Sequence, residues 1–334
     1  MSDAGMRTPL PSSYLPSLYP KTRMDRDAWI LARRPGRNTL DPSQPYAFFV
    51  EDECSADGEI VSVATVFLTN RECPWRCLMC DLWKNTLTET VPTGAIPSQI
   101  DYALEHLLPV RQIKLYNSGS FFDTRAIPLQ DYPAILSRVA SFERVIVECH
   151  PALVSESCFR FNDQLTGRLE VAMGLETVHP EILERLNKGM TSDQFATAAS
   201  RLREHNIDLR VFILVKPPFM RQQEALYWAE RSLDFAFACG ATAATLIPTR
   251  PGNGALEELA SLGDFSQPRL ATLEAALAYG ISLNRGRVFA DLWDGNPPTE
   301  CPHCYPSRTA RLRSMNLQQS ISEPVSCTHC GGDT

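Results

Sequence analysis

The chain of 334 residues lacks a long hydrophobic run. Its longest apolar-rich stretch, residues 61–68, is far shorter than the roughly 18 residues that a membrane-spanning helix requires. The first residues also lack the apolar stretch of a signal peptide. We therefore expect a cytoplasmic protein that makes no membrane contact.

The sequence has little positive charge as well, with 32 Lys and Arg against 39 Asp and Glu and a formal net charge of -7. Such a chain provides no global field that would attract a nucleic acid. Two short segments, residues 21–37 and 308–313, are locally basic. Solvated surface charge is the ordinary explanation, and an anionic partner such as RNA is the alternative.

Seven of the eleven cysteines lie at spacings typical of metal ligands. In a long chain without a secretion signal, this pattern favours reduced thiols over disulfides. The remaining four are interpreted as small buried apolar residues, since free cysteine is among the most buried residue types: Cys54, Cys149, Cys158 and Cys239.

Cys73, Cys77 and Cys80 follow a predicted strand at residues 62–70. Three thiolates leave one iron of a cubane 4Fe-4S cluster without a protein ligand, and a small molecule can bind there. A structural zinc ion is the alternative. Zinc normally takes a fourth protein ligand, however, and no Cys or His lies within 20 residues after Cys80. The spacing therefore favours an open 4Fe-4S cluster.

Short β-rich runs alternate with segments of helical periodicity along the rest of the chain, which implies β/α units and a parallel sheet. We predict an α/β fold, an incomplete (β/α)6 barrel, because a complete barrel would need two more strands. The predicted strands after the first are 112–116, 144–149, 169–175, 208–215 and 243–247; the helices are 97–108, 129–141, 180–186, 192–205, 222–239 and 267–278.

Three regions are expected. Residues 1–45 form a basic, partly disordered N-terminal extension with several prolines. Residues 46–295 form the partial barrel, with its functional site at the carboxyl ends of the strands. Residues 296–334 form a metal-binding segment.

The C-terminal segment contains two Cys-x-x-Cys pairs, Cys301 with Cys304 and Cys327 with Cys330. Four thiolates in two tight turns suit tetrahedral zinc, so we favour Zn²⁺ over the alternative of a second iron-sulfur cluster. His303 and His329 are interpreted as solvent-facing loop residues, with a role as spare ligands as the alternative.

The run from residue 71 to residue 81 resembles the signature of the radical S-adenosylmethionine (SAM) superfamily, in which the open iron chelates the amino and carboxylate groups of SAM. The resemblance implies reductive cleavage of SAM to a 5'-deoxyadenosyl radical, with a flavodoxin- or ferredoxin-type electron donor. An aromatic residue often precedes the third cysteine in the superfamily. Here Met79 takes that place, and its polarizable side chain can cover a ring face.

The resemblance also implies a SAM pocket. Ser118, Gly119 and Ser120 match the small-residue turn that binds the SAM amino group. Glu148 and Glu176 close two predicted strands and match positions that often contact SAM. Glu170, near the start of its strand, and His150 are interpreted as structural, through a salt bridge and a hydrogen bond.

Stretches at 38–42 with 45–46, 116–123, 174–177, 187–190 and 214–219 are similar to the radical SAM beta subunit of archaeosine synthase and its uncharacterised relatives, within the elongator-type group. This similarity implies a radical step on a modified 7-deazaguanine base in tRNA, where hydrogen abstraction from an attached lysine leads to C–N bond cleavage. A separate partner subunit would attach that lysine. Lys216 is the candidate catalytic cation, and a simple chain turn at residues 216–218 is its alternative.

Two rival functions remain. The first is another radical SAM reaction on RNA or protein, such as sulfur insertion, methylation or dehydrogenation. The second is a non-catalytic zinc-ribbon protein that binds RNA or a partner. The intact set of Cys73, Cys77 and Cys80 argues against the second.

Overall fold

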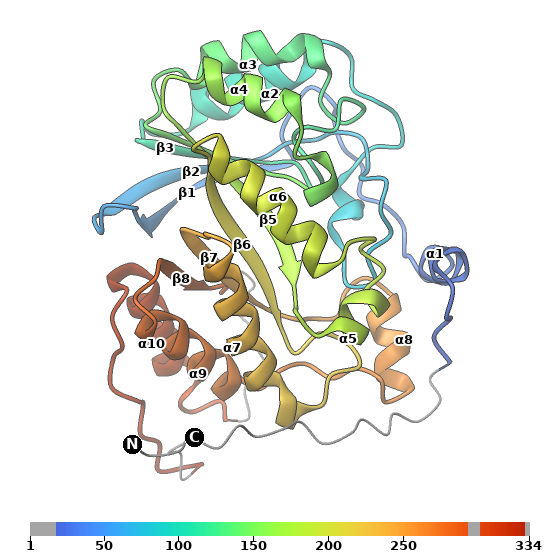
Figure 1. Cartoon of the computed structure of the whole chain (residues 1–334), viewed down its shortest axis with the longest axis vertical. Coiled ribbons are helices and arrows are strands. Elements are labelled where there is room, and N and C mark those ends of the chain that lie inside the picture. The colour runs from blue at the N-terminus through green and yellow to red at the C-terminus, as the bar shows by residue number, and fades with distance from the viewer. Residues whose placement is uncertain (1–17, 293–300, 331–334) are drawn as a thin grey trace.

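The computed structural model describes residues 18–292 and 301–330 (Figure 1). One curved sheet has its eight strands in sequence order. The first two strands are antiparallel, and every later neighbour is parallel. The strands are β1 (Ala47–Cys54), β2 (Ile60–Phe67), β3 (Gln112–Tyr116), β4 (Arg144–Glu148), β5 (Arg168–Glu176), β6 (Asp208–Val215), β7 (Ala243–Pro248) and β8 (Arg287–Ala290).

Helices connect the parallel strands. Figure 1 shows α2, α3 and α4 grouped at one end of the molecule and α7, α9 and α10 at the other. None of the helices that the structure describes is long and apolar enough to cross a membrane. The helices are α1 (Arg23–Leu31), α2 (Ala95–His106), α3 (Tyr132–Val139), α4 (Glu156–Gln164), α5 (Pro180–Arg185), α6 (Ser192–Glu204), α7 (Gln222–Ala238), α8 (Ala255–Ser261), α9 (Leu270–Ser282) and α10 (Tyr305–Gln318).

The predicted α/β class and open parallel barrel are confirmed, but the sheet has two more strands than expected. All six predicted strands are present, and the first ends at Phe67 rather than at residue 70. The prediction missed β8 because it has only four residues, and β1 because three consecutive acidic residues, 51–53, interrupt its apolar pattern. Parts of the predicted disordered lead and of the C-terminal segment fall on residues 1–17, 293–300 and 331–334, outside the described residues.

Helix α10 closes the free edge of β8. Asn316 accepts a hydrogen bond from Ala290 N and donates one to Ala290 O, both at 2.8 Å. Gln319 makes the same pair of bonds with Val288, at 2.7 and 2.9 Å. The helix packs against β1 as well. Its two side-chain amides thus occupy backbone groups that an edge strand otherwise leaves unpaired.

The amino-terminal part of the barrel interior holds a buried ionic network. Glu170 pairs with Arg144, Arg210 and Arg287 at 2.9, 2.6 and 3.0 Å. Burial opposes ionisation of Glu170, but the three guanidiniums hold its pKa at about 2. Glu53 in β1 and Lys114 in β3 extend the network. Glu170 thus makes the structural salt bridges that its position predicted, at the end of the strands opposite the cysteine loop.

Candidate active site and metal centre

Cys73, Cys77 and Cys80 lie in the loop after β2, at the carboxyl ends of the strands. Burial raises the pKa of each thiol to about 12, and each thiol interacts electrostatically with another of the three. The three sulfurs therefore lie near one another in the loop. Among the described residues, the cysteine sulfurs that all lie within 4.8 Å of one another are those of the four C-terminal cysteines, and not those of Cys73, Cys77 and Cys80. The wider separation of these three sulfurs suits the corners of a cluster better than the ligands of one zinc ion.

Two neighbouring segments hold the cysteine loop in place. Asn253, after β7, donates to Leu78 O at 2.7 Å and to Cys80 O at 3.3 Å. Asn187, after α5, donates to Arg76 O at 2.9 Å. Backbone carbonyls between and beside the cysteines thus have fixed partners, which limits the positions that the thiols can take.

The turn at residues 118–120 packs against this loop. A β-carbon at Gly119 would meet the Cys73 β-carbon at 3.2 Å, so the absence of a side chain permits the close approach. The Glu148 carboxylate accepts hydrogen bonds from the backbone N–H groups of Asn117 and Ser118 at 2.8 and 3.0 Å. Burial raises the pKa of Glu148 to about 7 in spite of these bonds. One oxygen of Glu148 therefore supports the turn.

Glu176 pairs with Lys188 at the end of β5. Glu176 Oε1 accepts from Lys188 Nζ at 2.5 Å, and both side chains are buried. A β-carbon at Gly174 would overlap both charged groups, so glycine at this position leaves room for the pair in the arrangement observed. Burial opposes the Lys188 charge, but Glu176 holds its pKa above the ordinary value. Cys73 and Cys77 are close enough to act on the same ammonium group.

No pattern in the sequence indicated Lys188 as a site residue. The residue lies twelve positions after Glu176 in the stretch 187–190, and no metal-type or strand-end spacing distinguishes it. Tyr46 was missed for a similar reason. Its hydroxyl lies 3.0 Å from Ser118 Oγ, although the residue precedes β1, far from the cysteines in sequence.

His150 supports the loop from the side of β4. Its ring stacks on Trp75, between the first two cysteines, with centroids 3.7 Å apart. The ring also hydrogen-bonds Lys188 O at 3.2 Å and Ala152 N at 3.2 Å. Because burial lowers the pKa of His150 to about 3, the imidazole is neutral. The expected structural hydrogen bonding of His150 is present.

Lys216 follows β6 and is buried. Its ammonium group donates to the carbonyl of Ser266 and, at 2.7 Å, to the Ser266 hydroxyl. Burial lowers the pKa of Lys216 to about 8. Among the described ion pairs none joins Lys216 to a carboxylate, so its proton is held less firmly than that of Lys188.

Three of the predicted site residues have left-handed backbones, with φ values of 54° at Ser118, 66° at Glu176 and 53° at Lys216. Few residues other than glycine adopt this conformation. Backbone strain of this kind concentrates at functional sites. These three residues follow or end different strands, so the strain points to one functional edge of the sheet.

Several buried polar atoms near this edge have no hydrogen-bond partner among the described residues. They are Thr69 Oγ1, Asn70 Oδ1 and both amide atoms of Asn117, at the ends of β2 and β3. Buried polar groups normally have partners. Together with a set of desolvated thiols that a metal would deprotonate, these atoms fit a site that is completed by a cofactor.

No protein-family model matches the chain. The uncharacterised protein MJ0550 of Methanocaldococcus jannaschii is 26% identical over 237 residues, which cover 66% of this chain and 65% of that protein, just under two thirds of its length. Archaeosine synthase subunit beta of Methanosarcina acetivorans is 25% identical over 285 residues, 80% of this chain and 82% of that subunit. Among solved structures, methylornithine synthase (PylB) has the same fold, with a TM-score of 0.50, 14% identity and coverage of 77% and 71%.

The similarity to archaeosine synthase subunit beta over 80% of the chain, together with the shared fold, supports the predicted resemblance to the radical SAM superfamily. The Cys73, Cys77 and Cys80 loop and the partial barrel are the two features of this chain on which the assignment rests.

The chain has a second cysteine site next to its barrel. The sulfurs of Cys301, Cys304, Cys327 and Cys330 all lie within 4.8 Å of one another. The pairs Cys301–Cys327 and Cys304–Cys330 are each separated by 3.9 Å. A regular tetrahedron with Zn–S bonds of about 2.3 Å has sulfurs about 3.8 Å apart. The rings of His303 and His329 stack on each other, and neither residue belongs to this group.

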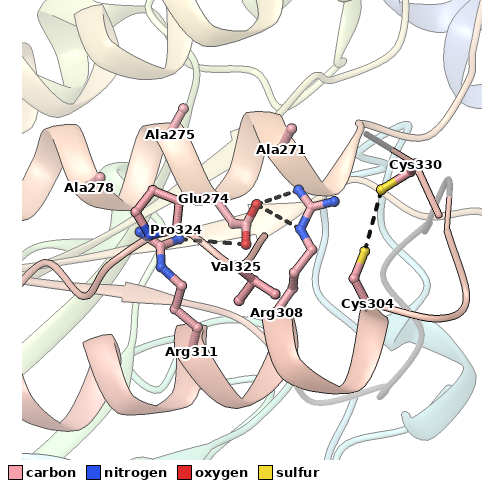
Figure 2. A pocket seen from close by; sticks show the side chains of 10 residues that line it. All are labelled: Ala271, Glu274, Ala275, Ala278, Cys304, Arg308, Arg311, Pro324, Val325 and Cys330. Carbon is pink, nitrogen blue, oxygen red and sulfur yellow. Dashed lines mark hydrogen bonds and ion pairs between the residues drawn. The ribbon is translucent and has the colours of Figure 1, made fainter. Parts of the chain in front are cut away.

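A cavity of about 180 Å³ adjoins the C-terminal cysteines (Figure 2). Arg308 donates to Glu274 through two nitrogens, one at 3.0 Å. Arg311 lies 3.6 Å from the other Glu274 oxygen and donates to Ser322 O. These two arginines thus connect α10 with α9 and with the segment that carries the second cysteine pair.

Ion pairs like these change the interpretation of the two basic segments, residues 21–37 and 308–313. Most of their arginines have internal acidic partners and do not form a free positive surface: Arg26 with Glu184, Arg33 with Glu258, Arg34 and Arg37 with Glu72, and Arg308 and Arg311 with Glu274. Lys21, Arg23 and Arg313 are exposed.

Proposed function

We propose that the protein is a radical SAM enzyme whose cluster is held by Cys73, Cys77 and Cys80. The observation that carries the proposal is the placement of three neighbouring, partly buried thiols in one loop, with Cys73 against Gly119 and with Cys73 and Cys77 near the Lys188 ammonium group that pairs with Glu176. A 4Fe-4S cluster bound by these thiols would receive one electron from a flavodoxin- or ferredoxin-type donor and pass it to SAM, whose reductive cleavage gives methionine and a 5'-deoxyadenosyl radical.

The residues around the pocket have separate tasks in this proposal. The turn of Ser118, Gly119 and Ser120 binds the amino group of SAM, and Glu148 keeps the turn rigid through its two backbone hydrogen bonds. Glu176 accepts hydrogen bonds from a ribose hydroxyl or an ammonium group. Lys188 supplies the positive charge for the SAM carboxylate.

Replacing Lys188 with Gln should weaken SAM binding about tenfold or more, because a buried cation near the cofactor carboxylate is removed. Equilibrium binding of SAM to the reconstituted protein measures the effect, with iron content as the check that the cluster remains. The single change leaves Glu176 without its partner, which is costly for a buried charge. The double variant Lys188→Gln/Glu176→Gln removes both charges and should bind SAM as weakly. Normal affinity in the double variant would contradict this assignment.

Lys216 should give the protein a pH-dependent stability. Its folded-state pKa of about 8 lies below the ordinary lysine value, so folding penalises the charged form. The penalty is complete below pH 8 and disappears as pH rises from about 8 toward 10.4. Stability should therefore increase over this interval, by roughly 1–2 kcal/mol after allowance for solvent screening.

Thermal unfolding of wild type and Lys216→Met across pH 7 to 10 tests this prediction. The variant should lack the gain that wild type shows above pH 8, whereas Lys21→Met, at an exposed position, should retain it. Identical profiles for wild type and Lys216→Met would show that the amine titrates normally. A role for Lys216 as the catalytic cation requires a separate loss of product formation in this variant with SAM binding intact.

The proposed substrate is a modified base in tRNA, with C–N bond cleavage of the 7-deazaguanine type. Support comes from the two relatives named archaeosine synthase subunit beta, from Methanosarcina acetivorans and Thermococcus kodakarensis. Their subunit name also supports a separate partner subunit, and we propose that this partner attaches lysine to the base. The exposed Lys21, Arg23 and Arg313 are the basic residues of the two segments that remain available for phosphates.

Two measurements test the function at its two levels. Chromatography after reduction should detect 5'-deoxyadenosine and methionine; their absence with an intact cluster would favour a binding protein. Mass spectrometry of tRNA nucleosides from a deletion strain should show a changed base. An unchanged nucleoside profile together with normal SAM cleavage would direct attention to another radical SAM reaction, such as sulfur insertion, methylation or dehydrogenation.

A further inference from the structure

The N-terminal segment runs along the cysteine loop. Arg34 donates to Glu72 Oε1 at 2.7 Å, and Arg37 donates to Glu72 Oε2. Glu72 directly precedes Cys73. The side chains of Arg34 and Glu72 are only 8% and 11% exposed, so the pair forms largely out of water. Breaking such a pair leaves a buried charge uncompensated, which fixes the first end of the loop to the segment.

The same arginines reach the other end of the loop. Both guanidiniums lie over the Trp83 ring, that of Arg34 at 4.6 Å from the centroid. Trp83 donates from its indole nitrogen to Cys80 O at 3.1 Å. Arg37 also donates to Trp83 O at 2.7 Å. The contacts therefore bracket the loop before its first cysteine and after its last.

A third contact fixes the middle of the loop. Asp27 of α1 accepts a hydrogen bond from Asn187 Nδ2 at 2.7 Å. The same nitrogen donates to Arg76 O at 2.9 Å. Asn187 has a left-handed backbone, with φ of 60°. The side-chain amide of Asn187 thus connects the N-terminal segment with the loop.

We propose that Asp27, Arg34 and Arg37 form a clamp that positions the cysteine loop, and that the positive charge at the clamp favours the reduced state of the bound cluster. The inference rests on the proposed function, since it requires a cluster on Cys73, Cys77 and Cys80. Arg34 is its principal positioning residue.

The charge balance supports the redox part of the proposal. Arg34, Arg37 and Arg76 all pair with the single carboxylate of Glu72, so this group of four side chains carries two positive charges in excess next to Cys73. Net charge and hydrogen bonding near the sulfurs are among the factors that set the potential of an iron-sulfur cluster.

Substitution at Arg34 separates charge from geometry. In the reconstituted full chain, Arg34→Gln should shift the one-electron reduction equilibrium about tenfold toward the oxidised state, a midpoint about 59 mV lower. Arg34→Lys retains the charge and should restore most of the midpoint. The measurement is a redox titration followed by electron paramagnetic resonance, with iron content determined in parallel.

Arg33→Gln is the matched control, because Arg33 stacks on Trp29 and pairs with Glu258 rather than with Glu72. An unchanged midpoint in Arg34→Gln with a fully loaded cluster would overturn the inference, as would equal shifts in the Arg34 and Arg33 variants. If Arg34→Gln loads too little iron to titrate, Arg37→Gln, at a more exposed side chain, should show the same shift, and a normal midpoint there would overturn the inference. A wild-type protein that binds no cluster would refute the proposed function instead.

Discussion

A variant in which Cys73, Cys77 and Cys80 are all replaced with alanine is expected to lose its active-site iron and reduce SAM cleavage to background. The three thiols are the protein ligands proposed for the cluster, and an open cluster already has one iron without a protein ligand. Iron and sulfide analysis of anaerobically reconstituted protein, with electron paramagnetic resonance of the reduced state, measures the loss.

The control for this variant is Cys239→Ala, which removes a partly buried thiol at the end of α7, away from both cysteine sites. It should retain iron, signal and SAM cleavage. The metal at Cys301, Cys304, Cys327 and Cys330 should be unaffected in both variants. A triple variant that kept the full resonance signal would place the cluster elsewhere and contradict the proposed function.

The architecture was largely predictable because its parallel strands follow one simple pattern. Strands such as β4, with the sequence Arg-Val-Ile-Val-Glu, are short apolar runs bounded by polar residues, and helices of regular period separate them. The edges of the sheet were not predictable. β8 is four residues long, and the backbone groups at its outer edge are paired by the side-chain amides of Asn316 and Gln319 at the end of α10. Such pairing produces no periodic pattern of apolar residues in the sequence.

The ligand residues of the site were predictable for a different reason. Metal-binding cysteines must converge in space, so short spacings such as those of Cys73, Cys77 and Cys80 reveal them. Residues that act by contacts between distant segments have no such signal. Lys188 reaches Glu176 only because β5 and the stretch after α5 meet at the edge of the sheet, and Gly174 leaves room for the pair.

The basic segments could not be interpreted from the sequence for the same reason. The arginines of residues 21–37 are consistent with an RNA-binding segment when the sequence is considered alone, because their acidic partners Glu72, Glu184 and Glu258 are remote in the sequence. Folding brings these carboxylates to Arg34, Arg37, Arg26 and Arg33. A basic run therefore indicates a nucleic-acid surface only if the fold leaves it without internal partners.

Replacing Cys327 and Cys330 with serine is expected to remove zinc while iron at the active site is retained. Each of the two remaining thiols would lose its partner at 3.9 Å. The segment after α10 would then be held mainly by Arg311 through Ser322 O. Because metal binding contributes to folding free energy, stability should fall by on the order of several kcal/mol. Metal analysis and thermal unfolding measure both effects.

The double substitution is preferable to removal of residues 296–334, because that truncation would also delete α10 and uncover the edge of β8. In the double variant, Asn316 and Gln319 still accept hydrogen bonds from the backbone N–H groups of Ala290 and Val288. Hydrogen exchange at these two groups should therefore become faster only if the loss of metal displaces α10. His303→Ala is the control and should retain zinc, because the ligand group consists of the four thiols alone.

If the iron content of the double variant instead fell by about half, the C-terminal cysteines would hold an auxiliary cluster. The 3.9 Å sulfur separations argue for a single tetrahedral ion and against that outcome, because the thiolates of a cluster bind different iron atoms and lie farther apart.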